Sequence, residues 1–239
     1  MSNTSTSNEL VEAVKKGDLA GVVAAFDAGA DIEVRSKFGC PALVTAASLG
    51  HTEIVSYLLA RGANIHVKAE QDSTPLHNAR NREIVWILLA YGASLEAHDE
   101  FGATPLHWSV VKPECLNVLL NWGAEIEAED DEGYTPIWRA IDESIHESIV
   151  TLILRGASIA PPRIGTVGHT VYYNNFDIFL VLCKMLLHSP GLEAALKRRR
   201  PDVFVELIQH QTNNVKFIEI WNKIDDPMHK VSHKGDTYL

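Results

Sequence analysis

Histidine has the most versatile chemistry among the side chains of this sequence, and two histidines occur in the same short segment. His77 and His107 each close a Thr-Pro-Leu-His segment, and they lie 30 residues apart. A neutral imidazole can act as a general base or bind a metal ion. Buried histidines, however, usually have their ring nitrogens satisfied by hydrogen bonds. We therefore predict a structural role for both residues rather than a catalytic or metal-binding one.

The other residues suited to metal or redox chemistry form no complete site. His229 and His233 are four residues apart and could share one face of a helix as zinc ligands, but no third ligand with suitable spacing accompanies them. Cys40, Cys115 and Cys183 are far apart and odd in number, which indicates a reducing compartment rather than a disulfide framework. The sequence has no phosphate-binding glycine loop and no evident nucleophile. We expect no catalytic residue, no metal and no cofactor.

The segments that would position these residues recur along the chain. The doublet Gly-Ala closes similar segments at steps of 33, 30, 31 and 33 residues, beginning at Gly29, Gly62, Gly92, Gly123 and Gly156. A period of this length is typical of a solenoid, in which each unit buries its apolar face by stacking on its neighbours. The period predicts a stack of similar units.

Each unit contains the signals of two helices. Thr74, Thr104 and Thr135 each precede proline and an apolar residue; threonine caps a helix, and proline fits its first position. A second segment, such as 84–89, has the apolar spacing of a packed helix, and the glycine of Gly-Ala suits the left-handed turn that ends it. The predicted unit is helix, turn, helix and hairpin loop, and the predicted fold class is all-α.

The segment from Asp99 to His107 matches the pattern Asp-x-x-Gly-x-Thr-Pro-Leu-His. In this respect the chain resembles the ankyrin repeat family. The resemblance, together with the apolar spacing of the residues after 161, predicts an ankyrin-repeat solenoid of five clear repeats plus a degenerate sixth and a C-terminal helical cap. It also implies that His77 and His107 tie adjacent hairpin loops together by hydrogen bonds. Trp138 replaces this histidine in repeat five, which puts the usual hydrogen bonds there in doubt.

The repeat register gives the expected domain organisation. After a polar N-terminal tail at 1–7, five repeats occupy 8–161, with limits near 8–34, 35–67, 68–97, 98–128 and 129–161. The degenerate sixth repeat is expected at 162–191, the helical cap at 192–225 and a polar tail at 226–239.

Repeats three and four are shortened. They lack three and two residues relative to repeats two and five. The loss falls after Ala79 and near Lys112, at the turn that joins the two helices. We expect the second helix of repeat four to start at Pro113 and the shortened turn to open a notch beside Trp108.

The resemblance implies a binding surface, because in this family the hairpin tips and the exposed side of the first helix line a concave groove. Trp108 occupies the variable position after His107, and Arg139 holds the same position in the next repeat. Aromatic and arginine side chains commonly dominate interface energies, although Trp108 could instead pack over the next repeat. The predicted partner-binding residues are Phe38, Glu100, Phe101, Trp108, Asp131, Glu132, Tyr134 and Arg139.

The predicted function is a non-catalytic protein–protein interaction module. The alternative is small-molecule binding or enzymatic activity in a pocket between the degenerate sixth repeat and the cap. That pocket would be lined by His169, Tyr172, Tyr173, Asp177 and His188. A third possibility is an adaptor, in which the C-terminal helices hold a second partner.

Charge and hydropathy restrict the partner classes. The chain has 21 Lys and Arg against 31 Asp and Glu, a net charge of -10, which disfavours nucleic acid and favours a basic partner. Acidic residues gather at 125–132, either for such a partner or to keep a loop solvated. No apolar run reaches the roughly 20 residues of a membrane span, and the first eight residues lack the features of a secretory signal. We expect an intracellular monomer that is cytoplasmic, with a nuclear location left open, and no membrane contact.

Overall fold

The computed structural model describes residues 3–143 and 145–158. Helices α1 to α10 and a short 3-10 turn, η1, make up its regular structure. Their bounds are α1 Asn3–Lys16, α2 Leu19–Asp27, α3 Ala42–Leu49, α4 Thr52–Ala60, η1 Glu70–Asp72, α5 Pro75–Asn78, α6 Arg82–Ala90, α7 Pro105–Ser109, α8 Pro113–Asn121, α9 Pro136–Asp142 and α10 His146–Leu154.

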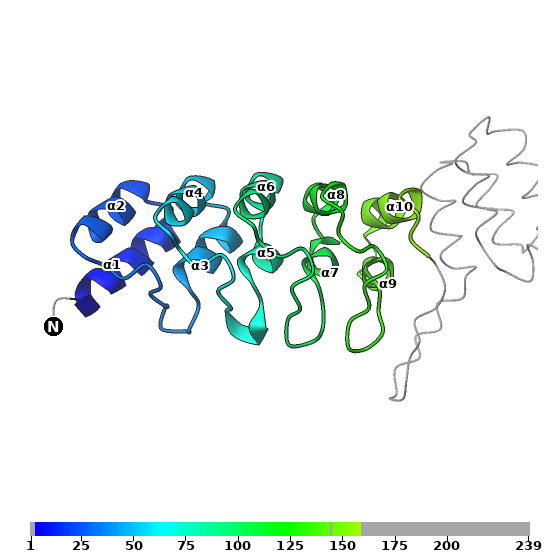
Figure 1. Cartoon of the computed structure of the whole chain (residues 1–239), viewed down its shortest axis with the longest axis horizontal. Helices are drawn as coiled ribbons and strands as arrows, with labels where there is room; N and C mark the ends of the chain where they lie inside the picture. Colours follow the sequence, from blue (N-terminus) through cyan, green and yellow to red (C-terminus); the bar gives the residue numbers. More distant parts are fainter. Residues whose placement is uncertain (1–2, 144, 159–239) are drawn as a thin grey trace, which may run out of the picture.

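The helices stack as pairs. Figure 1 shows the odd-numbered helices in one row and the even-numbered helices in a second row, with the hairpin loops projecting beside the odd-numbered row. Each helix contacts the equivalent helix of the next pair, as α5 contacts α7 and α6 contacts α8. Among the described residues, β-type pairing is limited to an isolated bridge between Arg35 and Pro41. The predicted all-α repeat fold is confirmed.

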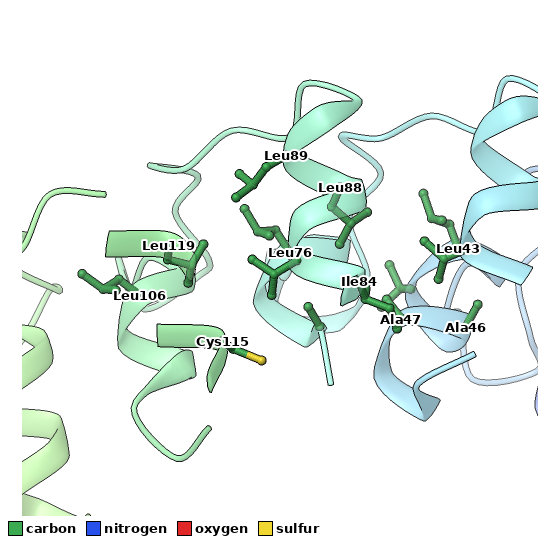
Figure 2. Packing of buried hydrophobic residues seen from close by; sticks show 14 of the residues in the cluster. Leu43, Ala46, Ala47, Leu76, Ile84, Leu88, Leu89, Leu106, Cys115 and Leu119 are labelled. Carbon is green, nitrogen blue, oxygen red and sulfur yellow. The ribbon is translucent and has the colours of Figure 1, made fainter. Parts of the chain in front are cut away.

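The core follows the repeat period. Leu58, Leu88, Leu119 and Leu152 hold equivalent positions in the even-numbered helices, and each is at most 1% exposed. They belong to one apolar cluster that runs through the described repeats. Figure 2 shows labelled members of this cluster from α3 to α8 gathered between the helix rows. Because each pair is buried only by its neighbours, the stack forms a single core.

The shortening of repeats three and four falls on their first helices and not, as expected from the sequence, on the turn that joins the two helices: the linkers 79–81 and 110–112 are as long as 143–145 in repeat five. Helix α5 has 4 residues and α7 has 5, compared with 8 in α3 and 7 in α9. Side chains of the following repeat donate hydrogen bonds to the backbone carbonyls that end these short helices. Lys112 Nζ donates to Ala79 O at 2.8 Å, and Ser148 Oγ donates to Val110 O. Helix α8 begins at Pro113, as predicted.

One hairpin departs from the others in its backbone. Asp72 has φ 56°, at the position where Gly39, Gly102 and Gly133 also have positive φ. Glycine adopts this left-handed conformation without the steric cost that a β-carbon brings. The Lys68–Asp72 ion pair at 2.9 Å is solvent-exposed, so it contributes little stability.

We therefore expect Asp72→Gly to be more stable than Asp72→Asn. Both variants lose the ion pair, but only glycine removes the β-carbon, so the free energies of unfolding should differ by about 0.5–1 kcal/mol. Urea unfolding of the two variants side by side measures the difference. Equal stability would show that the left-handed backbone at this position is not strained.

Several predicted features fall outside the described residues. These are the sixth repeat at 162–191, the cap at 192–225, the tail at 226–239 and the histidine pair His229 and His233. The five residues of the alternative pocket also fall there: His169, Tyr172, Tyr173, Asp177 and His188. At the other end, α1 begins at Asn3 and so includes residues that were assigned to the polar N-terminal tail.

Candidate functional site

A buried aspartate organises each of the hairpins that open repeats four and five. Asp99 Oδ1 accepts the backbone N–H of Phe101 at 2.9 Å. Asp130 Oδ1 accepts the backbone N–H groups of Glu132 and Tyr134 at 3.0 and 2.9 Å. These bonds fix the backbone conformation of the hairpin tips.

The second oxygen of each aspartate orients the side chain at the variable position after the histidine. Trp108 Nε1 donates to Asp99 Oδ2 at 2.9 Å, and Arg139 donates to Asp130 Oδ2 from Nε and Nη2 at 2.9 and 2.6 Å. The Trp108 ring also meets His77 edge-on, with ring centroids 6.0 Å apart. Trp108 is thus held in place against the preceding repeat.

Neighbouring hairpin tips are bonded to one another. Glu100 N–H donates to Gln71 O, and Asp131 N–H donates to Phe101 O, both at 2.9 Å. The tips of repeats three, four and five therefore form a connected edge. Together with the exposed sides of the odd-numbered helices, this edge forms the surface that we call the hairpin face.

A hollow of about 300 Å³ opens on the hairpin face between repeats four and five. It lies beside Trp108, where the shortened turn was expected to open a notch. Its lining combines an aromatic hairpin tip, the variable positions of two repeats and the turn after the short helix α7. The lining residues are Asp99, Phe101, Ala103, His107, Trp108, Val110, Val111, Arg139 and Glu143.

The hollow brings together three of the predicted partner-binding residues, Phe101, Trp108 and Arg139. Val111 and Glu143 also line it but were not singled out from the sequence. The missing residues of repeat four were the one signal that pointed to the place of Val111. Nothing in the sequence distinguished Glu143 from other surface acids.

The remaining predicted residues lie outside the hollow. Glu100, Asp131 and Glu132 are exposed on the hairpin tips beside it. Tyr134 is partly buried, with the Arg139 guanidinium 5.1 Å from its ring centroid. Phe38 is 67% exposed on the hairpin that opens repeat two, and the structure does not place it with the others.

His77 and His107 tie adjacent hairpins together, as predicted. His107 Nδ1 accepts the backbone N–H of Thr104 at 3.1 Å and also meets its Oγ1. His107 Nε2 lies 2.9 Å from Tyr134 O in the next hairpin; because a carbonyl only accepts, Nε2 carries the proton. His77 is bonded in the same way to Thr74 and to Ala103 O. With both ring nitrogens engaged, neither histidine is free to bind a metal or act as a base.

Trp138 interrupts this series in repeat five. It is 4% exposed and cannot accept the hydrogen bond that histidine accepts from the capping threonine. Thr135 Oγ1 accordingly has no hydrogen-bond partner within the part of the chain that the structure describes. The doubt raised from the sequence about this network is confirmed.

The two buried histidines should make stability depend on pH. Burial lowers the pKa of His77 and of His107. The unfolded chain therefore binds more protons than the folded chain between the lowered pKa values and the ordinary value of about 6.5. The free energy of unfolding should be highest above about pH 6.5 and fall as the pH drops below it.

Urea unfolding between pH 7.5 and pH 5.5 measures this slope. Replacing either histidine with glutamine, which does not titrate, should make the slope shallower. An unchanged slope in both His77→Gln and His107→Gln would show that these residues are not its source.

Two further properties of the described residues bear on function. No group of three or more His, Cys, Asp and Glu side chains within them is arranged to hold a metal ion. None of the helices among them combines the length and apolar character that crossing a membrane requires.

A family model described as ankyrin repeats (3 copies) matches residues 10–99 and 78–162. The two overlapping matches together cover more than half of the 239 residues, and they contain the hairpin face and its hollow. No curated protein matches the chain.

Proposed function

This chain belongs to the ankyrin repeat family, and we propose that it is a non-catalytic module whose hairpin face, over repeats three to five, binds a protein or peptide partner. Ankyrin repeats are generally protein–protein interaction modules. The proposal adds the surface and the character of the partner.

The observation that carries the proposal is the hollow between repeats four and five. Its aromatic and basic side chains, Phe101, Trp108 and Arg139, belong to the residue types that most often anchor interfaces. Trp108 and Arg139 are already oriented by Asp99 and Asp130. Side chains ordered before binding lose little entropy on binding, so this surface suits recognition better than a surface of mobile side chains.

The charge of this region favours a basic partner. Residues 96–147 contain 13 Asp and Glu but only two basic residues, Lys112 and Arg139. Both are already engaged, Lys112 with Ala79 O and Arg139 with Asp130. The remaining negative potential would steer a basic segment toward the face and accelerate its association.

Affinity capture from the native cell tests the proposal. The full chain is used as bait in three forms, wild type, Trp108→Ala and Trp86→Ala, and the captured proteins are read by mass spectrometry. Trp86 is the matched control because it is 58% exposed on α6, in the other helix row.

The proposal predicts a partner that wild type and Trp86→Ala retain and Trp108→Ala loses. Retention by all three forms, or loss with Trp86→Ala alone, would contradict it.

A further inference from the structure

We infer that the hollow between repeats four and five is a socket for one arginine side chain of the partner. The inference rests on the proposed function, because it specifies what the same surface recognises.

Asp99 and Asp130 occupy the same position in successive repeats and cap their hairpins in the same way, but their charges are balanced differently. Asp130 is paired with the Arg139 guanidinium, 2.6 Å from Nη2 to Oδ2. Asp99 lines the hollow, is 6% exposed and receives hydrogen bonds from two backbone N–H groups and from Trp108. No ion pair to Asp99 exists among the described residues. A cation entering the hollow would therefore meet a fixed carboxylate whose negative charge is not already neutralised by an ion pair.

The aromatic group beside each aspartate points to the same ligand. In repeat five the Arg139 guanidinium lies 5.1 Å from the ring centroid of Tyr134. In repeat four the hollow offers the larger indole of Trp108, already fixed by its bond to Asp99. Tryptophan is the best cation–π partner among the aromatic residues. A guanidinium from outside would thus meet in repeat four the combination of carboxylate and aromatic ring that Arg139 meets in repeat five.

The other walls fit the rest of an arginine side chain. Val110 and Val111 provide an apolar wall for its methylene stem. Glu143 is exposed directly after the end of α9, and its carboxylate forms no ion pair with any residue that the structure describes. Arginine fits better than lysine because its planar group can stack on the indole while it donates to carboxylates.

Arg139 also lines the hollow, but its charge is already compensated. Besides Asp130, whose side chain is fully buried, it lies 3.6 Å from Glu132 Oε2. The hollow therefore presents a net negative charge to an incoming side chain, in spite of the arginine in its wall.

Peptide selection tests the socket directly. A phage library of random nine-residue peptides is selected on the full chain, and the selected sequences are synthesised with each arginine kept or replaced by citrulline, its neutral analogue. We expect the selected peptides to share one arginine. Its replacement should weaken binding to the wild-type chain about tenfold or more, because both the ionic and the cation–π contacts are lost.

Variants of the chain locate that arginine. The citrulline replacement should weaken peptide binding to Glu143→Gln and to Trp108→Leu clearly less than it weakens binding to the wild-type chain. Glu114→Gln is the matched control, because Glu114 is an exposed acid at the start of α8 that does not line the hollow, and it should leave the full penalty in place.

The outcomes separate the socket from the proposed function. Peptides that require Trp108 but tolerate citrulline, or whose citrulline penalty is the same in all variants, would overturn the socket and leave the binding face standing. Peptides that bind Trp108→Ala as well as wild type, or a selection that yields no binder, would overturn both.

Discussion

Replacing Trp108 with alanine is expected to weaken partner binding by about 30-fold or more, because a well-buried aromatic anchor commonly contributes on the order of 2 kcal/mol. The indole lines the hollow and is pinned by Asp99 and His77, so it is presented without a large entropy cost. Isothermal titration calorimetry with the purified partner found by affinity capture measures the change in Kd.

Two further variants show that the effect is local. Trp86→Ala removes a comparable aromatic surface from the other helix row and should leave the Kd within about twofold. Trp108→Phe keeps an aromatic ring but cannot donate to Asp99, so we expect an intermediate loss. If Trp108→Ala folds normally and still binds within about threefold of wild type, the hollow is not the centre of the interface.

Replacing His107 with alanine is expected to lower the free energy of unfolding by about 3 kcal/mol. The side chain is 4% exposed and bonds to Thr104 in its own hairpin and to Tyr134 O in the next. Its loss leaves buried groups unsatisfied, at about 1–3 kcal/mol each, and opens a cavity with a further cost. Urea unfolding near pH 7.5, where the histidine is neutral, gives the value.

His66→Ala provides the control for this measurement. His66 is exposed on the loop after α4, and exposed substitutions of this kind usually change stability by less than about 0.5 kcal/mol. A loss below about 1 kcal/mol in His107→Ala would mean that the histidine does not hold the hairpins together.

The helical pairs could be predicted because their signals are local. Pro113 marks the start of α8, since proline is tolerated in the first turn of a helix but disrupts its interior. The bridging role of His107 was implied by the resemblance to ankyrin repeats, and its partner in the next hairpin lies 27 residues away, close to one repeat length. Features that recur with the period can be predicted once the period is known.

The hollow could be predicted only in part because its lining residues come together only when the hairpins fold back and successive repeats stack. Trp108 and Asp99 are nine residues apart and meet only when the hairpin folds back on α7. Glu143 follows the end of α9, and it meets Trp108 and Val111 in the hollow only because the next repeat stacks on the short helix α7. Asp72 adopts a left-handed backbone conformation although it is not glycine, so the residue type at this position did not predict that conformation.

Site-specific photocrosslinking is the most direct test of the claim that the partner lies on the hairpin face. The photoreactive residue p-benzoylphenylalanine replaces either Phe101, 48% exposed at the rim of the hollow, or Trp86 on α6, and each chain is irradiated with the purified partner. Crosslinks from position 101 and none from position 86 are the predicted result. Crosslinks from position 86 and none from position 101 would place the partner on the other helix row and contradict the account.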